Sequence, residues 1–163
     1  MDPVVQSVLK AFDELGREAV ELSALAEFIP SASKGRATPA DPAALRTLLA
    51  QLVEQGWLRP AGAPDAFVRT EDGRLALAGP RDVTLYTRPG CHLCEEAEAQ
   101  IAPLLAQFGA KLREVNIEAD PALRERYNDD VPVIFLGARK IAKHRVNLEQ
   151  FRRQLASAAG NSR

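Results

Sequence analysis

The only two cysteines of this 163-residue chain, Cys91 and Cys94, stand three positions apart in the stretch TLYTRPGCHLCEEAEAQ. The residues before them read as a strand and the residues after them as a helix. The pair therefore sits where the first turn of a helix exposes unpaired N–H groups and a partial positive charge. A sulfur at such an end is favoured as the thiolate, which is the nucleophilic form, so this junction is predicted to be reactive.

The composition is that of an ordinary soluble globular protein, with 46% hydrophobic and 26% charged residues. The amino-terminal stretch MDPVVQSVLKAFDELG lacks the basic start and unbroken apolar run of a secretory signal, and no run approaches membrane-spanning length. We therefore expect a cytoplasmic protein. In that compartment a cysteine pair is more often catalytic or metal-binding than a structural crosslink.

Gly79 and Pro80 end one pattern just before a strand with alternating residues begins, which predicts two domains, 1–79 and 80–163. The first 80 residues hold eight Lys/Arg against eleven Asp/Glu, a net charge of −3, and residues 81–163 hold thirteen against eleven, a net charge of +2. Neither half is a polycation suited to phosphate backbones.

The first half is predicted to form three helices followed by a small hairpin and a last short helix. Helix-start signals stand at Asp2–Pro3, Ser23, Asp41–Pro42 and Thr70. The stretch PSASKGRATPADP is predicted to be a loop, and two short strands flank a Gly-Ala-Pro-Asp turn.

With the segments LLAQLVEQGWLRP and FVRTEDGRLAL, this order resembles a winged helix-turn-helix domain over most of residues 4 to 78. The resemblance implies a mainly α amino-terminal domain, with Arg46, Thr47, Gln51 and Arg69 as candidate contacts to DNA or to a protein partner. Affinity for duplex DNA comes largely from neutralised phosphates, and this half is net acidic although Lys34 and Arg36 add charge in its long loop. For the first half of the chain we therefore prefer a role in protein contacts or dimerisation over sequence-specific binding of DNA.

The second half is predicted as strand, helix, strand, short helix, strand, strand and terminal helix, with a kink or an early end near Ala102 because Pro103 interrupts the first helix. This βαβ unit followed by ββα is the order of an α/β thioredoxin-like domain, with a mixed four-stranded sheet and flanking helices. The segments TLYTRPGCHLCEEAEAQI and VPVIFLGARKIAKHRVNLEQF resemble the small bacterial glutaredoxin-like family of the thioredoxin superfamily over residues 82–157.

The resemblance implies that Cys91 is the attacking thiol, that Cys94 is the resolving thiol, and that Pro132 is a cis-proline beside them. The backbone of Val131 is then expected to pair with an extended substrate strand. Arg88 is expected to add a positive charge near Cys91 and to contact substrate. If these effects lower the thiol pKa from about 8.5 to about 6, roughly nine tenths of the thiol is ionised at neutral pH.

The two histidines have other interpretations. His92 is either a solvated residue or a cation that tunes the thiol by stabilising the thiolate, and His144 is expected to have no chemical role. A tetrahedral zinc site needs a second chelating pair that the chain does not offer, so no metal is predicted. Where glutaredoxins hold glutathione with Gly-Gly and an acid, this chain has KIAKHRVN, which leaves glutathione as a candidate co-substrate beside a disulfide-containing protein.

The leading hypothesis is a two-domain thiol–disulfide oxidoreductase whose winged-helix domain recruits a partner or forms a homodimer. One alternative is a redox-responsive transcription regulator with the cysteine domain as sensor. Another is an iron–sulfur carrier that uses Cys91 with glutathione.

Overall fold

Three helices of the chain begin at an aspartate that is followed by proline. They are α1 (Pro3–Glu14), α3 (Pro42–Glu54) and α6 (Pro121–Tyr127). The carboxylates of Asp2, Asp41 and Asp120 accept the N–H two residues further on, at 2.7, 3.2 and 2.9 Å. Each bond satisfies one backbone donor that the first turn leaves unpaired, and proline lacks an N–H that would need a partner there.

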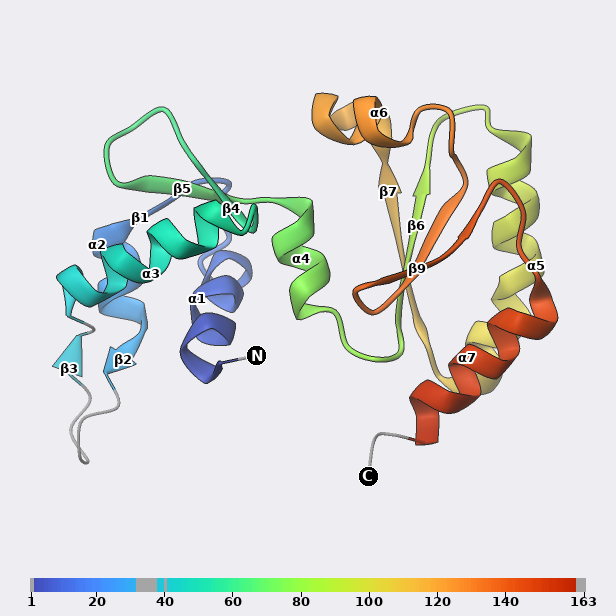
Figure 1. Cartoon of the computed structure of the whole chain (residues 1–163), viewed down its shortest axis with the longest axis horizontal. Helices are drawn as coiled ribbons and strands as arrows, with labels where there is room; N and C mark the ends of the chain where they lie inside the picture. Colours follow the sequence, from blue (N-terminus) through green and yellow to red (C-terminus); the bar gives the residue numbers. More distant parts are fainter. Residues whose placement is uncertain (1, 32–37, 40, 161–163) are drawn as a thin grey trace. The chain divides into compact units, whose positions relative to one another are not determined.

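The computed structural model describes residues 2–31, 38–39 and 41–160, and its chain divides into two compact units, Met1–Leu77 and Ala78–Arg163 (Figure 1). The sequence predicted the boundary after Gly79, within the connection between the last helix of one unit and the first strand of the other. No helix in the described ranges is both long and apolar enough to cross a membrane.

The described residues of the first unit form four helices and a three-stranded antiparallel sheet of strand order β1-β5-β4. Besides α1 and α3 it contains α2 (Leu22–Phe28), α4 (Glu71–Leu77), β1 (Val20–Glu21), β4 (Leu58–Pro60) and β5 (Ala66–Arg69). The short strand β1 was not predicted, because two residues are too few to show alternation. It pairs with β5 through Val20 opposite Phe67.

The predicted loop after α2 contains a short antiparallel pair, β2 (Pro30–Ser31) with β3 (Thr38–Pro39). Lys34 and Arg36, which the sequence analysis counted as added positive charge, lie outside the described residues.

The core of the first unit is built from the apolar faces of α1, α2 and α3. Its fully buried side chains include Val8, Leu9, Leu25, Leu49 and Leu52. These are residues that recur at helical spacing in the sequence, so their burial follows from the pattern.

Arg69 lies inside this unit, contrary to the expectation that it contacts a partner or DNA. Only 7% of the residue is exposed, and its guanidinium donates to the carbonyl of Leu9 at 2.7 Å and to both carboxylate oxygens of Asp13. A buried cation needs such partners to offset its lost hydration, so Arg69 ties β5 to α1 and is withdrawn from the surface.

The turn from β5 into α4 depends on Thr70 and Gly73. Thr70 Oγ1 accepts the N–H of Gly73 at 3.1 Å and donates to the carbonyl of Gly56 at 2.6 Å, which confirms Thr70 as the cap. A Cβ added at Gly73 would collide with the backbone carbonyl of Trp57 and lie 3.0 Å from Cγ of Arg69. The glycine therefore allows α4 to approach the strand at Trp57.

The second unit is a mixed four-stranded sheet with flanking helices, as predicted, and it fits a thioredoxin-like domain (Figure 1). Its strands are β6 (Asp82–Thr87), β7 (Lys111–Asn116), β8 (Val133–Leu136) and β9 (Arg139–Lys143), and its helices are α5 (His92–Phe108), the 3-10 turn η1 (Ile117–Ala119), α6 and α7 (Leu148–Gly160). The strand order is β7-β6-β8-β9, with β7 parallel to β6 and the other two pairs antiparallel.

The two faces of this sheet are covered by different helices. Val83 and Leu85 of β6 pack with residues of α5 and α7, including Ile101 and Phe151. Side chains alternate along a strand, so Tyr86 points to the opposite face. There its ring packs against those of Tyr127 in α6 and Phe135, with centroids 4.7 and 5.5 Å away.

The sequence predicted a kink or an early end near Ala102; helix α5 continues through Pro103 to Phe108, so the early end is wrong. Proline removes one helical hydrogen bond, yet Ile101 and Leu105 on either side are buried against the sheet. The helix ends instead at Gly109, whose left-handed conformation (φ 59°) suits glycine.

We predict that Gly73→Ala destabilises the first unit by about 1–3 kcal/mol, because the new Cβ displaces the Trp57 carbonyl or the Arg69 stem. Urea unfolding followed by the fluorescence of Trp57, the only tryptophan, measures this change. Gly62→Ala is the matched control, since a Cβ there meets no atom within 4 Å. Equal midpoints for the two variants would contradict the close approach.

Candidate redox site

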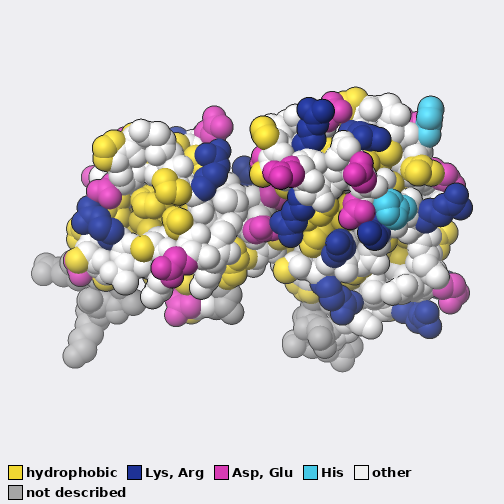
Figure 2. Space-filling view, turned by 45° about the horizontal axis from the view of Figure 1, so that its top comes forward, with side chains coloured by type: hydrophobic (Ala, Val, Ile, Leu, Met, Phe, Trp, Pro, Cys, Tyr) yellow, Lys and Arg dark blue, Asp and Glu magenta, His cyan; other side chains and the backbone are white. Residues whose placement is uncertain are grey.

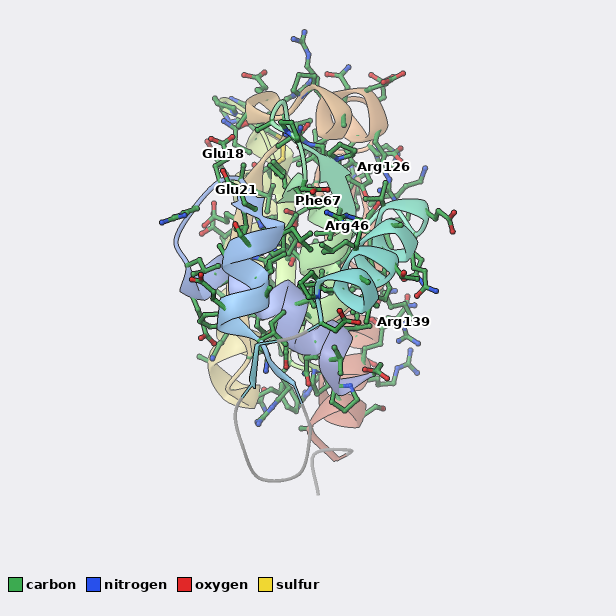
Figure 3. The ribbon with its side chains drawn as sticks, turned by 90° about the vertical axis from the view of Figure 1, so that its left-hand side faces the viewer. Glu18, Glu21, Arg46, Phe67, Arg126 and Arg139 are labelled. Carbon is green, nitrogen blue, oxygen red and sulfur yellow. A yellow bond between two sulfur atoms is a disulfide. The ribbon has the colours of Figure 1, made fainter. Side chains whose placement is uncertain are left out.

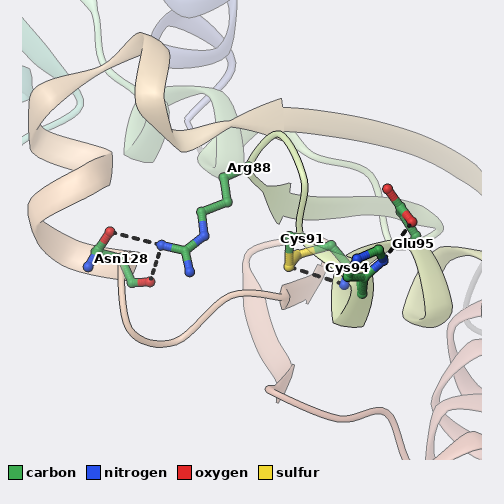
Figure 4. Close-up of a disulfide and its surroundings, with 6 residues drawn as sticks. Arg88, Cys91, Cys94, Glu95 and Asn128 are labelled. Carbon is green, nitrogen blue, oxygen red and sulfur yellow. Dashed lines mark hydrogen bonds and ion pairs between the residues drawn. A yellow bond between two sulfur atoms is a disulfide. The ribbon is translucent and has the colours of Figure 1, made fainter.

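Cys91 and Cys94 form a disulfide at the start of α5, with their Cα atoms 5.3 Å apart (Figure 4). Cys91 is the N-cap of the helix, and its Sγ accepts the N–H of Cys94 at 3.2 Å. The sulfur thus takes the place that the carboxylate oxygen of an aspartate holds in α1 and α3. An anionic sulfur at this position would be stabilised by the same unpaired donors.

The two cysteines differ in exposure. Cys94 is 2% exposed, whereas Cys91 is partly exposed and follows Gly90, which adopts φ 71°. A left-handed residue before the helix turns the chain sharply, and glycine does so without strain. The structure therefore presents the first sulfur to solvent and keeps the second one turn inside.

The peptide bond between Val131 and Pro132 is cis, as expected. Val133 pairs with Tyr86, so the proline lies opposite the end of β6, whose continuation leads to Cys91. The backbone of Val131 was expected to pair with a substrate strand, and in this structure its N–H donates to the carbonyl of Tyr127 at 3.2 Å.

Arg88, which was expected to add a positive charge near Cys91 and to contact substrate, binds Asn128 in this structure. Its Nη1 donates to Asn128 at the end of α6, 3.2 Å from Oδ1 and 3.5 Å from the carbonyl oxygen (Figure 4). The arginine therefore joins the loop before Cys91 to α6, and the structure gives it no direct bond to the sulfur. Sequence spacing could not reveal this, because Asn128 is forty positions away.

His92 is the most solvated residue of the site, with 96% of its side chain exposed. Its Nδ1 lies 3.6 Å from Oε2 of Glu95, on the next turn of α5. Water and salt screen an ion pair at such a surface position, which favours the solvated interpretation of His92 over a thiol-tuning one.

Asp130, just before the cis bond, is held by the end of β9. Lys143 Nζ lies 3.1 Å and His144 Nε2 lies 3.6 Å from its Oδ1. The hydrogen bond from Lys143 lowers the pKa of the Asp130 carboxyl below its usual value, and the positive charges of Lys143, His144 and Lys140 act in the same direction.

His144 has a structural role that the sequence analysis missed. It adopts φ 62°, and its N–H donates to the carbonyl of Pro132 at 2.9 Å and to that of Asp130 at 3.3 Å. The residues are brought together by the β8–β9 pairing, in which Val133 lies opposite Lys143. No local signal marks this contact.

A cavity of about 240 Å³ opens beside the first turns of α5. It is lined by Leu93, Glu96, Ala97 and Gln100 of the helix and by His144, Arg145 and Val146. Leu93, which stands between the cysteines, is 45% exposed, so an apolar side chain borders the disulfide. The sequence analysis did not identify this cavity.

Three of the four residues predicted to contact DNA or a partner, Arg46, Thr47 and Arg69, form hydrogen bonds within the first unit. Arg46 pairs with Asp65 at 2.6 Å, which raises the arginine's already high pKa and lowers that of the aspartate. Thr47 Oγ1 donates to the carbonyl of Ala43 at 3.1 Å, and Arg69 is buried. Gln51 is exposed on α3.

No group of three His, Cys, Asp or Glu side chains in a metal-holding arrangement occurs in the described part of the chain.

Residues 82–156 match the family model described as "Glutaredoxin-like domain (DUF836)". Uncharacterized proteins from Mycobacterium tuberculosis and Mycobacterium bovis are 27% identical over 85 residues, covering 49% of this chain and 88% of theirs. Two solved structures are also similar. A protein of Nitrosomonas europaea is 32% identical over 45% of this chain and 89% of its own, with a TM-score of 0.41. A protein of X. campestris is 31% identical over 46% and 96%, with a TM-score of 0.37.

We predict that the Asp130 carboxyl titrates below the ordinary aspartate value of about 3.9, because its ionised form holds the Lys143 hydrogen bond. A group whose folded pKa is lowered contributes stability above the unfolded pKa and loses that contribution as the pH falls through the folded one. Carbon-13 NMR titration of the wild type and of Lys143→Met measures the midpoint, which should rise in the variant. Lys140→Met, which removes only the weakest of these charge effects, is the control. An unchanged midpoint in Lys143→Met would contradict the contact.

Proposed function

Because residues 82–156 carry a glutaredoxin-like domain, we propose that this chain is a thiol–disulfide oxidoreductase that works by dithiol exchange through Cys91 and Cys94. One observation carries the proposal. The partly exposed Cys91 sulfur caps α5 and accepts the N–H of Cys94, whose own sulfur is buried one turn inside. This arrangement separates a thiol that can meet a substrate from a thiol that can resolve the product.

The reaction starts from the reduced pair. The Cys91 thiolate attacks one sulfur of a substrate disulfide, forms a mixed disulfide and releases the other substrate sulfur as a thiolate. The Cys94 thiolate then attacks Cys91 Sγ, closes the disulfide present in this structure and releases the second substrate thiolate. Two electrons pass from the pair to the substrate, and an external thiol or dithiol reductant returns the pair to its reduced state.

The cis-proline loop supports docking of an extended substrate strand. Since the N–H of Val131 is bonded to Tyr127, the carbonyl of Val131 is the backbone group offered to such a strand, beside Pro132. Arg88, on the loop before Cys91, is placed to meet a substrate carboxylate if it exchanges its bonds to Asn128. The substrate is a disulfide-containing protein, with glutathione as the candidate small co-substrate.

The first unit is proposed to be a winged-helix domain that recruits a partner or dimerises. Three helices precede the β4–β5 hairpin, and β1 joins the sheet beside β5. Protein contact is preferred over DNA reading because Arg46 is paired with Asp65 and Arg69 is buried, so two of the cations that would neutralise phosphates are engaged. We propose that the protein acts in the cytoplasm.

Cys91→Ser is expected to reduce insulin disulfide reduction, driven by dithiothreitol, to the rate of dithiothreitol alone, because the attacking sulfur is gone. Cys94→Ser is expected to accumulate a mixed disulfide on residue 91, visible by intact-mass spectrometry and reversed by added reductant. His92→Ala should keep wild-type activity, since that side chain is solvated. A wild-type protein no faster than dithiothreitol alone would refute the oxidoreductase.

Cys91 in the reduced protein is expected to react with iodoacetamide with an apparent pKa below the ordinary thiol value of about 8.5, because the helix N-terminus stabilises its thiolate. The pH dependence of the alkylation rate, with the modified residue identified by mass spectrometry, measures it. His92→Ala should leave the curve nearly unchanged. A midpoint at or above 8.5 would count against an activated thiol.

A further inference from the structure

A groove in the first unit, remote in sequence from the cysteines, is built from three elements and encloses about 300 Å³. Its apolar walls are Leu22 and Ala26 of α2, Pro42 at the start of α3 and Pro64 in the β4–β5 turn. Its polar rim consists of Glu21, Ser23 and Asp65. The volume is at the lower end of the range of ligand pockets, enough for a single extended side chain rather than a large cofactor.

The walls of this groove are held in place by bonds between the elements. The N–H of Leu22 donates to the carbonyl of Asp65 at 2.9 Å, which fixes the start of α2 to the β4–β5 turn. Arg46 of α3 forms two hydrogen bonds to the Asp65 carboxylate, at 2.6 and 3.4 Å, which fixes α3 to the same turn. The groove therefore exists before any partner arrives.

The two carboxylates at the rim are not equivalent. Asp65 is neutralised by Arg46, whereas the described contact of the Glu21 carboxylate is a hydroxyl, Ser23 Oγ at 3.4 Å. In the view of Figure 3, Glu18 and Glu21 are labelled to the left of Phe67 and Arg46 to its right. A negative charge at the end of an apolar groove is thus available for a cation.

The first unit as a whole is net acidic. Among the described residues of the first unit, six Lys/Arg stand against eleven Asp/Glu, and Arg69 and Arg46 are already bound to aspartates. Figure 2 shows hydrophobic side chains gathered on one face of this unit, with charged side chains at the margin. Phosphate backbones would be repelled here, while a basic protein segment would be attracted.

We propose that this groove binds a lysine or arginine side chain presented by a segment of a partner protein. The aliphatic stem would lie along Leu22, Ala26 and the two prolines, and the charged head would reach Glu21. The inference rests on the recruiting role proposed for the first unit, and it names the chemistry of the partner. It needs no participation of the cysteines.

The test uses the full chain, labelled with nitrogen-15, and acetylated, amidated peptides Gly-Leu-X-Leu-Gly in which X is lysine, arginine, norleucine or glutamate. NMR titration should show the lysine and arginine peptides shifting amide signals of Glu21–Ala26, Ala43 and Asp65, and the norleucine and glutamate peptides binding more weakly. Glu21→Gln should lower the affinity for the lysine peptide by about twofold to fivefold, which is the range expected for an exposed ion pair. Ser23→Lys, which places a cation at the rim of the groove, should lower the affinity for the lysine peptide by at least about twofold.

Glu54→Gln is the matched control, because it removes the same charge at the far end of α3, about 18 Å along the helix from Pro42. Its affinity should equal that of the wild type, and the dispersion of each spectrum reports whether the variant is folded. Equal binding of all four peptides, an equal loss in Glu54→Gln, or shifts of the groove signals by a short DNA duplex would overturn the proposal. Insulin reduction by the same samples tests the redox function separately, so one proposal can fail while the other stands.

Discussion

The hydrogen bond from the N–H of Cys94 to Cys91 Sγ is the contact on which the geometry of the cysteine pair depends. A helix end leaves several donors unpaired, and here a sulfur satisfies one of them in place of a carboxylate. Helix α5 is anchored by Cys94 and Ala97 in its first turns and by Ile101 and Leu105 further along. Hydrophobic burial up to about 20 Å along the helix thus helps to set the position of the sulfur at its start.

The loop opposite that tip is supported from three directions. The carbonyl of Tyr127 holds the N–H of Val131, the β8 strand continues directly from Pro132, and the end of β9 holds Asp130 through Lys143 and His144. Each contact is weak alone, since the ion pairs are partly solvated. Together they fix the loop by its backbone, which is how a binding loop remains in place without a large core of its own.

The two units use their arginines in opposite ways. In the first unit Arg69 and Arg46 satisfy aspartates of the same unit, so the remaining surface is acidic. In the second unit Arg88 binds neutral Asn128 groups and so keeps its net charge near the cysteine loop. A chain that is nearly neutral overall therefore divides its charge unevenly, with a net charge of −3 over residues 1–80 and of +2 over residues 81–163.

Local signals in the sequence were enough to predict the helix starts at Asp2 and Asp41, the place of the cysteines between a strand and a helix, and the succession of strands and helices along the second half. Capping, alternation and helical period act between residues a few positions apart, so a single chain reveals them. The early end that Pro103 suggested for α5 does not occur, since the helix continues and Ile101 and Leu105 beside the proline are buried, which no local rule indicates. Only the tertiary structure decided that Arg69 is buried on Asp13 and that Arg88 binds Asn128. The same is true of the support that His144 gives the cis-proline loop and of the groove lined by Glu21. Those contacts join residues that are far apart in the chain, and their partners are chosen by strand register and helix packing rather than by spacing.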